Sequence, residues 1–389
     1  MPDRQDLLFE IRVLPADGKA LIMADSPPER REARRDLPSL GRYTKRVQNA
    51  LMLGAKVRRG TSPGLIAAAE GDPNIYKELG AILFDWAMPP EVLALYRSTL
   101  HKAEQADSKV RFNLRIEMPA LATIPWETLF DPNEKRYLSL SPRILVTRGV
   151  EPLDLTISGA RPLRILVIVA NPTHEQLNGQ IRPLIALDAD AEFGRIRKTL
   201  RPLINDKAIE VFPVRLANKR ELFRRLRDAR MQRKPFDIVH FIGHGDFDKT
   251  RSMGYLLFRK EGGTEADHLY ADDFCDILDE CRPKLVILNS CRGATSDRQD
   301  LFSSTAAMII KRRVPAVVAM QYEISDEAAQ CFSQRFYSWL AEGMPIHQAL
   351  AATRRDIKDL GPEWITPVLF MRSIDGQFLT PAGAGGAAA

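Results

Sequence analysis

The hydrophobic pattern of the chain changes near residue 160. From there on, short apolar runs alternate with stretches of helical periodicity, and the runs include residues 163–170, 236–243 and 284–289. A continuous apolar run is typical of a strand that is covered on both faces. Strands that alternate with helices predict a parallel sheet built with right-handed crossovers. The pattern therefore predicts a doubly wound, mainly parallel α/β sheet flanked by helices.

The first part of the chain has a more mixed pattern. It predicts a β-hairpin formed by residues 7–13 and 19–24. Two helical stretches follow at 43–53 and 74–106, and consecutive prolines break the second. Two further strands are predicted at 110–118 and 143–148. Residues 110–118 alternate cleanly between apolar and polar, so we expect a half-buried strand there.

We divide the chain into three parts. Residues 1–158 form an amino-terminal half, residues 159–378 form the doubly wound half, and residues 379–389 form a tail. The tail is rich in glycine and alanine, which is the composition of a flexible linker.

Three local features of the second half are also predicted. Residues 188–203 have the periodicity of one helix, and residues 255–270 contain a Gly-Gly turn typical of a β-hairpin. The next helix begins near residue 272, where Asp272 or Asp273 is expected to cap it.

Composition narrows the class of protein. Of the 389 residues, 45% are hydrophobic and 27% are charged, as in a globular protein with a sizeable core. No apolar stretch has the length of a membrane-spanning helix, and the amino terminus lacks the pattern of a signal peptide, so we expect a cytoplasmic protein. The four cysteines are too few for a disulfide scaffold and include no C-x-x-C pair. Because nucleotide-binding and metalloprotease motifs are missing as well, we expect neither a metal nor another cofactor.

The net charge of +6 is concentrated in basic segments. One covers residues 30–35 and another residues 219–231. In the second segment, Leu222, Phe223 and Leu226 recur at helical spacing, so its arginines are interpreted first as the solvated face of an amphipathic helix. A docking surface for RNA or for an acidic protein is the alternative interpretation.

The residues with the most reactive side chains follow two of the apolar runs. His244 comes directly after one run, between Gly243 and Gly245, and Cys291 comes just after another. In parallel α/β sheets, reactive groups gather beyond the carboxyl ends of the strands. If the two strands are neighbours, the imidazole and the thiol meet at one edge of the sheet.

Such a pair is a candidate site for acyl transfer. A nearby base converts a thiol into the nucleophilic thiolate, and amide N–H groups stabilise the oxyanion that forms on a carbonyl substrate. The amides of Gly245 and Cys291 are candidates for the second role. A buried cysteine and a core histidine without catalytic function remain the other interpretation.

The same residues give the chain a resemblance to a known family. The matching segments are 240–247 (HFIGHGDF), the following hairpin, 284–294 (KLVILNSCRGA) and 317–326 (VVAMQYEISD), with 81–86 and 125–127 in the first half. In this order they resemble the CHAT domain family, caspase-like cysteine peptidases related to separase, caspases and gingipains. The resemblance covers roughly residues 5–375.

The resemblance implies a caspase-like fold whose amino-terminal half is a degenerate unit without a catalytic pair. It implies that His244 is the general base or proton donor and that Cys291 is the nucleophile, which forms a thioester. Gly245 and the amide of Cys291 would form the oxyanion hole. Asn289, two residues before Cys291, would line the pocket for the residue that precedes the cut.

A preference for Arg or Lys before the cut is also implied. Relatives with this preference have an acidic residue at the place of Asp326, and a carboxylate binds a cationic side chain by charge-assisted hydrogen bonds. The alternative is that Asp326 caps the helix beginning near residue 327, and Ser325 is a second candidate for that cap. Asp246 and Asp248 are further acidic candidates, for which we expect a solvated loop.

We therefore expect a caspase-like cysteine endopeptidase that cleaves a protein partner after Arg or Lys. The resemblance implies gating by a sensor or repeat-protein partner in a bacterial antiviral defence or cell-death pathway. Nucleic acid would act at most indirectly, and no membrane contact is expected. The alternative function is a catalytically silent caspase-like scaffold that binds RNA or an acidic protein through its basic surface.

Overall fold

The computed structural model describes the chain outside residues 1–5, 59–73, 150–156, 158–160, 178, 185–187, 215–216, 249, 291–300, 313, 323, 374–375 and 380–389. Within helices and strands, the description also leaves out the side chains at 42, 48, 52–58, 290, 301–304 and 326. The chain forms two compact units. Unit 1 consists of Met1–Glu151 with His347–Leu369, and unit 2 of Pro152–Ile346 with Phe370–Ala389.

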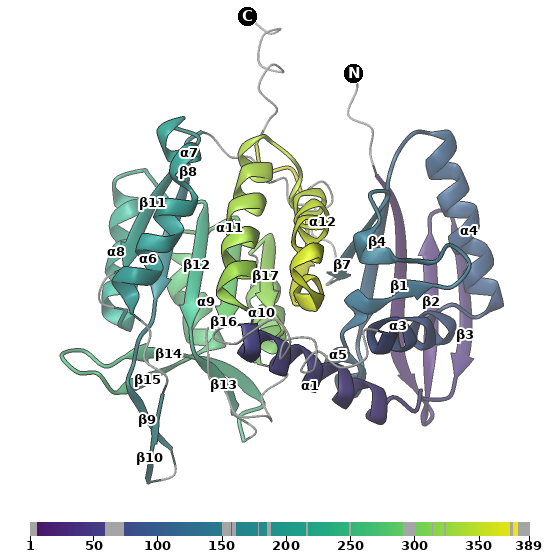
Figure 1. Ribbon diagram of the computed structural model, residues 1–389, viewed down its shortest axis with the longest axis horizontal. Helices are drawn as coiled ribbons and strands as arrows, with labels where there is room; N and C mark the ends of the chain where they lie inside the picture. The colour runs from purple at the N-terminus through teal and green to yellow at the C-terminus, as the bar shows by residue number, and fades with distance from the viewer. Residues whose placement is uncertain are drawn as a thin grey trace, which may run out of the picture. The chain divides into compact units, whose positions relative to one another are not determined.

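Unit 2 is built on a parallel sheet with the strand order β11, β8, β12, β16, β17 (Figure 1). The strands are β8 (Leu163–Val169), β11 (Ile209–Val214), β12 (Ile238–Gly243), β16 (Leu285–Ser290) and β17 (Ala316–Met320). The helices are α6 (Ala189–Thr199), α7 (Arg201–Asn205), α8 (Lys219–Met231), α9 (Ala271–Asp279), α10 (Leu301–Lys311) and α11 (Asp326–Ala341). Every residue of β12 and β17 is buried, which explains their continuous apolar runs. The predicted mainly parallel sheet flanked by helices is confirmed.

Strand β12 is covered on both of its faces. On one face, His240 shares a hydrogen bond of 3.0 Å with the hydroxyl of Tyr337 in α11. On the other, the ring of Phe241 lies 5.4 Å from that of Phe258 in β14 (Met253–Arg259). Because successive side chains of a strand point to opposite faces, α11 and β14 cover opposite faces of β12.

Two small antiparallel sheets complete unit 2. One has the order β13 (Gly245–Asp248), β14 and β15 (Ala266–Tyr270), and the other is the hairpin of β9 (His174–Leu177) and β10 (Gln180–Pro183). The sequence pattern predicted β14 and β15 but neither the β9–β10 hairpin nor β13.

Two local predictions for unit 2 are wrong. The single helix expected over 188–203 is divided into α6 and α7 at Leu200, because Pro202 in the first turn of α7 has no N–H to donate. The expected aspartate cap of α9 does not form either. Its N-cap is Tyr270, which makes no side-chain capping bond, and Asp272 and Asp273 lie in the first turn.

Unit 1 contains a mixed sheet of five strands, in the order β7, β4, β1, β2, β3. Strands β7, β4 and β1 are mutually parallel, and β1, β2 and β3 form an antiparallel meander. The strands are β1 (Leu7–Ala16), β2 (Lys19–Ser26), β3 (Glu29–Arg35), β4 (Val110–Ile116) and β7 (Ile144–Gly149). The longer helices are α1 (Gly41–Arg58), α3 (Asn74–Ala87), α4 (Pro90–Gln105) and α12 (Ile346–Ile357), and β18 (Pro367–Met371) follows α12 in the chain. The predicted hairpin at the start and the helix break at Pro89-Pro90 are both present.

The basic segment 30–35 is a strand, which the sequence pattern did not predict. As β3 it pairs with β2 along its whole length. Its charged side chains form exposed ion pairs, among them Arg30 with Asp25 at 2.5 Å and Arg31 with Glu29 at 3.3 Å. Charged side chains on an outer strand discourage pairing with other chains, so this part of the basic surface has a structural explanation.

Strand β4 is buried on both faces over Val110–Leu114, so the prediction of a half-buried strand is wrong. The polar side chain of Asn113 on this strand forms its hydrogen bonds inside the unit. The amide of Asn113 donates to Glu10 at 2.6 Å and accepts from Thr147 at 3.0 Å.

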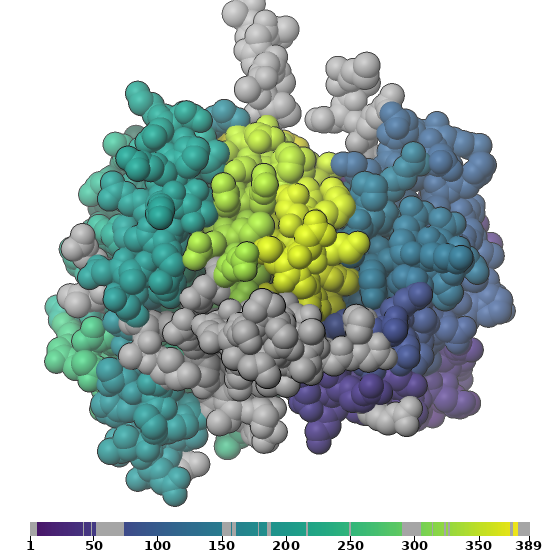
Figure 2. Space-filling view, viewed as in Figure 1, coloured from purple at the N-terminus to yellow at the C-terminus, as the bar shows by residue number. Residues whose placement is uncertain are grey.

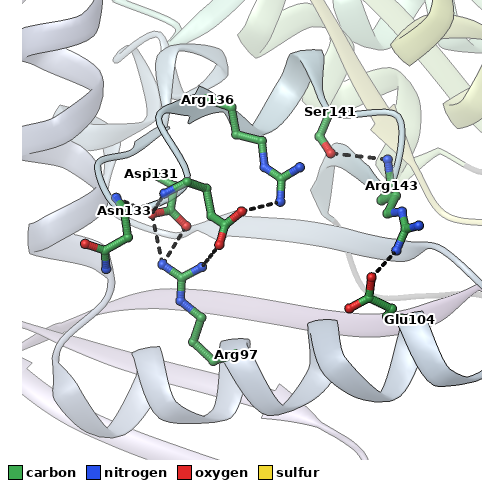
Figure 3. Close-up of polar contacts among 8 residues, drawn as sticks. Arg97, Glu104, Asp131, Asn133, Arg136, Ser141 and Arg143 are labelled. Carbon is green, nitrogen blue, oxygen red and sulfur yellow. Dashed lines mark hydrogen bonds and ion pairs between the residues drawn. The ribbon is translucent and has the colours of Figure 1, made fainter.

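A surface network joins α4 to the short turn that contains Asp131 (Figure 3). Arg97 of α4 lies 2.8 Å from the carboxylate of Asp131 and 3.5 Å from that of Glu134, which also pairs with Arg136 at 2.8 Å. Only Asp131 is fully buried among these groups, so the pairs contribute little to stability.

A buried ion pair holds the segment after α5 (Pro119–Ala122) against β7. Arg148 of β7 binds the carboxylate of Glu127 through two hydrogen bonds of 3.0 and 2.8 Å, and both side chains are less than a tenth exposed. The guanidinium also donates to the carbonyl oxygens of Ala122 and Ile124. This bidentate contact fixes Glu127 inside unit 1.

The substitution Glu127→Ala is expected to lower the free energy of unfolding by about 3–5 kcal/mol, because it leaves the Arg148 guanidinium buried without its counter-charge. Urea denaturation followed by circular dichroism measures this loss. Glu29→Ala, which removes a half-exposed ion-pair partner, serves as the control and should cost far less. Equal losses for the two variants would contradict the assigned role of the buried pair.

Candidate active site

The register of β12 and β16 aligns the ends of the two strands that precede His244 and Cys291. The strands are parallel, and their last paired residues are Gly243 and Ser290. His244 follows Gly243 directly, and Cys291 follows Ser290 directly in the sequence. Cys291 itself lies outside the described residues. The predicted pair requires that β12 and β16 be neighbours, and the two strands are neighbours as far as Ser290, the last described residue before Cys291.

His244 lies between two sheets. Its side chain is buried, and its carbonyl oxygen accepts a hydrogen bond of 2.9 Å from the amide of Leu257 in β14. The preceding Gly243 has no room for a side chain, since a Cβ there would lie 2.7 Å from the ring of Phe241. Because Gly243 has no side chain, the ring of Phe241 can pack directly against the backbone just before His244.

Gly245 begins β13 with a distinctive backbone orientation. In an antiparallel pair, only alternate residues direct their N–H and C=O groups toward the partner strand. Since the carbonyl of His244 is bonded to β14 and Gly245 is the next residue, the N–H of Gly245 points away from β14. Strand β14 therefore does not use this N–H group, and its predicted oxyanion role stays a prediction.

Asn289 lies on β16 opposite Ile242 of β12. The side chain is 5% exposed, and its Oδ1 atom accepts no hydrogen bond from any described residue. Paired residues of neighbouring strands share a face, so Asn289 lies on the face of the sheet where His240 meets Tyr337. Within the described part of the chain, this acceptor therefore remains available to a ligand.

His240 has a structural role. Its Nδ1 is bonded to Tyr337, and complete burial lowers the pKa of its imidazole to about 4. It therefore stays neutral at physiological pH, as expected for a core histidine. Among the residues that the structure describes, no group of histidine, cysteine and carboxylate side chains could hold a metal ion.

Two of the other cysteines are buried thiols. Burial raises the pKa of Cys275 to about 12 and that of Cys281 to about 11. Cys281 accepts a hydrogen bond of 2.9 Å from the amide of Phe236. Both thiols are therefore protonated at neutral pH and inert, as their predicted packing role requires.

Asp246 and Asp248 lie on strand β13, so the prediction of a solvated loop is wrong. Burial raises the pKa of Asp246, whose side chain is 15% exposed and lies 3.6 Å from the guanidinium of Arg182. Asp248 accepts hydrogen bonds from the backbone amide of Arg251 and from the hydroxyl of Tyr270, and its pKa is lowered. Both carboxylates therefore have partners within unit 2.

Asp246 belongs to a buried network that the sequence analysis missed. At its centre is Glu175 of β9, a fully buried carboxylate that accepts hydrogen bonds from the Tyr255 hydroxyl at 3.1 Å and from His268 Nε2 at 2.9 Å. Arg182 of β10 binds the second carboxylate oxygen of Glu175 and also contacts Asp246. The network thus connects the β9–β10 hairpin to the strand that begins one residue after His244.

The pKa of Glu175 reflects this network. Burial by itself would raise it, but the hydrogen bond from His268 and the charge of Arg182 outweigh burial and leave it lowered. A sequence signal for the hairpin exists in Asn178-Gly179, a dipeptide typical of tight β-turns, and Gly179 has a φ of +76°.

The helix cap at α11 is supplied by Ser325. Its side chain accepts a hydrogen bond of 3.3 Å from the amide of Ala328, while Asp326 is the first residue of the helix. The interpretation of Asp326 as the cap is therefore wrong, and the alternative cap is confirmed. The side chain of Asp326 lies outside the described part of the chain.

Comparison with protein families identifies the class. The chain matches the CHAT domain over residues 77–362, more than half of its length, and it belongs to this family. No curated protein matches the chain. Among its described residues, no helix has both the length and the apolar character needed to cross a lipid bilayer.

The fold is similar to that of separase. The chain aligns with separase from Saccharomyces cerevisiae, in the crystal structure of its complex with securin, with a TM-score of 0.52 and 12% identity over 94% of its residues. It spans 30% of that separase chain. At this identity the likeness shows the fold alone, and it confirms the predicted caspase-like α/β fold. A match to protein GSU0716 from Geobacter sulfurreducens has 14% identity over 57% of this chain and 96% of that one, but its TM-score is only 0.32.

Removing the central carboxylate with Glu175→Gln is expected to lower the free energy of unfolding at pH 7 by about 3 kcal/mol, because Arg182 and His268 lose a charged partner. The substitution should also weaken the pH dependence of stability. A carboxyl group with a lowered pKa stabilises the fold above its ordinary pKa of 4.5, and this contribution disappears as the pH falls further.

Urea denaturation at about pH 6 and about pH 3.5 measures both effects. The wild type should lose more stability between these pH values than Glu175→Gln does. Glu261→Gln, which alters an exposed partner of Arg220, is the matched control and should behave like the wild type. The same pH dependence in all three proteins would refute the role given to Glu175.

Proposed function

We propose that the chain is a caspase-like cysteine endopeptidase in which Cys291 is the nucleophile and His244 carries the proton. The observation that supports this most strongly is the pairing of Gly243 with Ser290, because it aligns the residues that immediately precede His244 and Cys291. Membership of the CHAT domain family supports the same assignment.

The proposed reaction has two steps. The thiolate of Cys291 attacks the carbonyl carbon of the scissile bond, and as the C–N bond breaks the amine leaves with the proton held by His244. Water then attacks the thioester and gives its proton to His244, and the C–S bond breaks to release the acid and restore the thiolate. The N–H of Gly245, which β14 does not use, would stabilise the oxyanion in both steps together with the amide of Cys291.

We further propose that the enzyme cleaves after Arg or Lys, with Asp326 and Asn289 at the pocket for that side chain. Because Ser325 caps α11, the helix does not need the carboxylate of Asp326 for this purpose. Asp246 is the weaker candidate, since it already lies beside Arg182. Asn289 contributes a buried acceptor that no described residue occupies.

Partners and regulation follow from the family resemblance. The separase structure is a complex with securin, and we propose that this chain also binds a protein substrate and is gated by a sensor or repeat-protein partner. A bacterial defence or cell-death pathway in the cytoplasm is the proposed setting. The division into a degenerate first half and an active second half after residue 158 belongs to the same proposal.

The alternative of a scaffold that docks RNA through residues 219–231 has no support from the charges of α8. The basic side chains of this helix are matched by nearby carboxylates. The pairs are Lys219 with Asp267, Arg220 with Glu261, Arg224 with Glu221 and Arg230 with Glu280.

The test is cleavage of fluorogenic peptides that differ in the residue before the cut. We expect the wild type to cleave after Arg or Lys, and both Cys291→Ala and His244→Ala to abolish cleavage. Asp326→Asn should reduce kcat/KM for Arg and Lys peptides by about ten- to a hundredfold, because a charge-assisted contact is lost. Asp246→Asn is the matched control and should leave the preference unchanged.

Three results would contradict parts of this proposal. Cleavage that survives Cys291→Ala would exclude the mechanism. A preference that changes with Asp246→Asn and not with Asp326→Asn would move the specificity pocket. A wild type that cleaves no peptide, even with a candidate activating partner added, would favour the catalytically silent scaffold.

A further inference from the structure

Helices α6 and α7 line a hollow on the surface of unit 2. None of its lining residues is among the candidate active-site residues. These helices form the teal surface at the upper left of Figure 2, and α6 packs against β8 and α11 (Figure 1). The hollow has a volume of about 420 Å³. It is lined by Gly194, Arg197, Lys198, Arg201, Ile204 and Asn205.

The three cations of the hollow have no counter-charge among the described residues. Arg197, Lys198 and Arg201 are exposed, and none of them forms an ion pair or a side-chain hydrogen bond with a residue that the structure describes. No carboxylate is among the lining residues. The neighbouring Arg195 of α6, by contrast, is paired with Glu192. The cations of α8 are also paired, so the hollow differs from that helix in its cluster of unpaired cations.

Gly194 is a second and independent sign of a binding site. It lies in the interior of α6, where glycine costs about 0.5–1 kcal/mol relative to alanine. A Cβ added there would meet no atom within 4 Å, and the residue does not have a positive φ, so neither packing nor backbone geometry within the protein requires glycine. The absence of a side chain at Gly194 leaves open space in the hollow.

We infer that the hollow binds a small molecule with a diphosphate group and a flat apolar part, such as a nucleoside diphosphate. A diphosphate carries a charge of about −3 at neutral pH, which matches three unpaired cations. Arginine binds phosphate oxygens through its planar fork, and lysine adds a point charge. Ile204 and the bare backbone of Gly194 offer an apolar surface for a ring, and the volume lies in the range of small-molecule sites.

The inference is tested by calorimetric titration of the full chain with ADP at about 0.15 M salt. Gly194→Leu fills the hollow and keeps all three cations, and it should weaken ADP binding at least about tenfold. Because leucine is the better helix former, the melting temperature should stay the same or rise by about 2 °C, so the loss of binding is not a loss of folding.

Charge reversal provides the second arm of the experiment. Arg197→Glu with Arg201→Glu should weaken ADP binding at least about tenfold, because two charged contacts are lost. The matched control reverses two cations of α8, Arg220→Glu with Arg224→Glu, and should change the affinity by less than about twofold.

Any of three results would overturn the inference. The first is a wild type that takes up no ADP in the titration. The second is a control pair of α8 that weakens binding as much as the pair in the hollow, which would indicate general electrostatic attraction. The third is binding of single-stranded RNA, but not of ADP, that depends on Arg197 and Arg201, which would assign the hollow to a nucleic acid. None of these results depends on peptidase activity.

Discussion

The structure around the candidate site depends on the parallel pairing of β12 with β16. Parallel strands need a crossover between them, so the residues that leave their carboxyl ends come together from distant parts of the sequence. Gly243 and Ser290 form the last pair of this ladder. A shift of one residue in the register would turn every side chain of the strand to the other face of the sheet, and burial on both faces of β12 opposes such a shift.

The small sheet β13–β14–β15 adds a second constraint at the same place. The chain passes from β12 into β13 through the single residue His244, whose carbonyl is bonded to β14. The buried carboxylate of Glu175 joins β14 and β15 to the β9–β10 hairpin through Tyr255 and His268. His244 is therefore held on both sides, by the parallel ladder before it and by a hydrogen-bonded ionic network beyond it.

The sequence predicts the elements that are apolar and periodic, and it fails where short polar strands depend on tertiary partners. Helix α8 has the predicted bounds 219–231 and strand β8 lies within the predicted run 163–170, because their buried apolar side chains follow the period of a helix and of a covered strand. Strand β3 was missed because its sequence is mainly charged and lacks the alternating apolar pattern of a strand. It is a strand because it pairs with β2. The position of Glu175 could not be predicted, since nothing in its local sequence indicates that His268, far along the chain, supplies its partner. The choice of Ser325 over Asp326 as the cap of α11 likewise depends on backbone geometry.

The central claim is that His244 activates Cys291, and the rate of alkylation by iodoacetamide as a function of pH tests it most directly. The raised pKa values of Cys275 and Cys281 keep these thiols silent, and a Cys331→Ser background removes the remaining one. The account predicts that Cys291 reacts with an apparent pKa well below the ordinary value of about 8.5, and that His244→Ala raises it toward that value. Identical pH profiles with and without His244 would contradict the account.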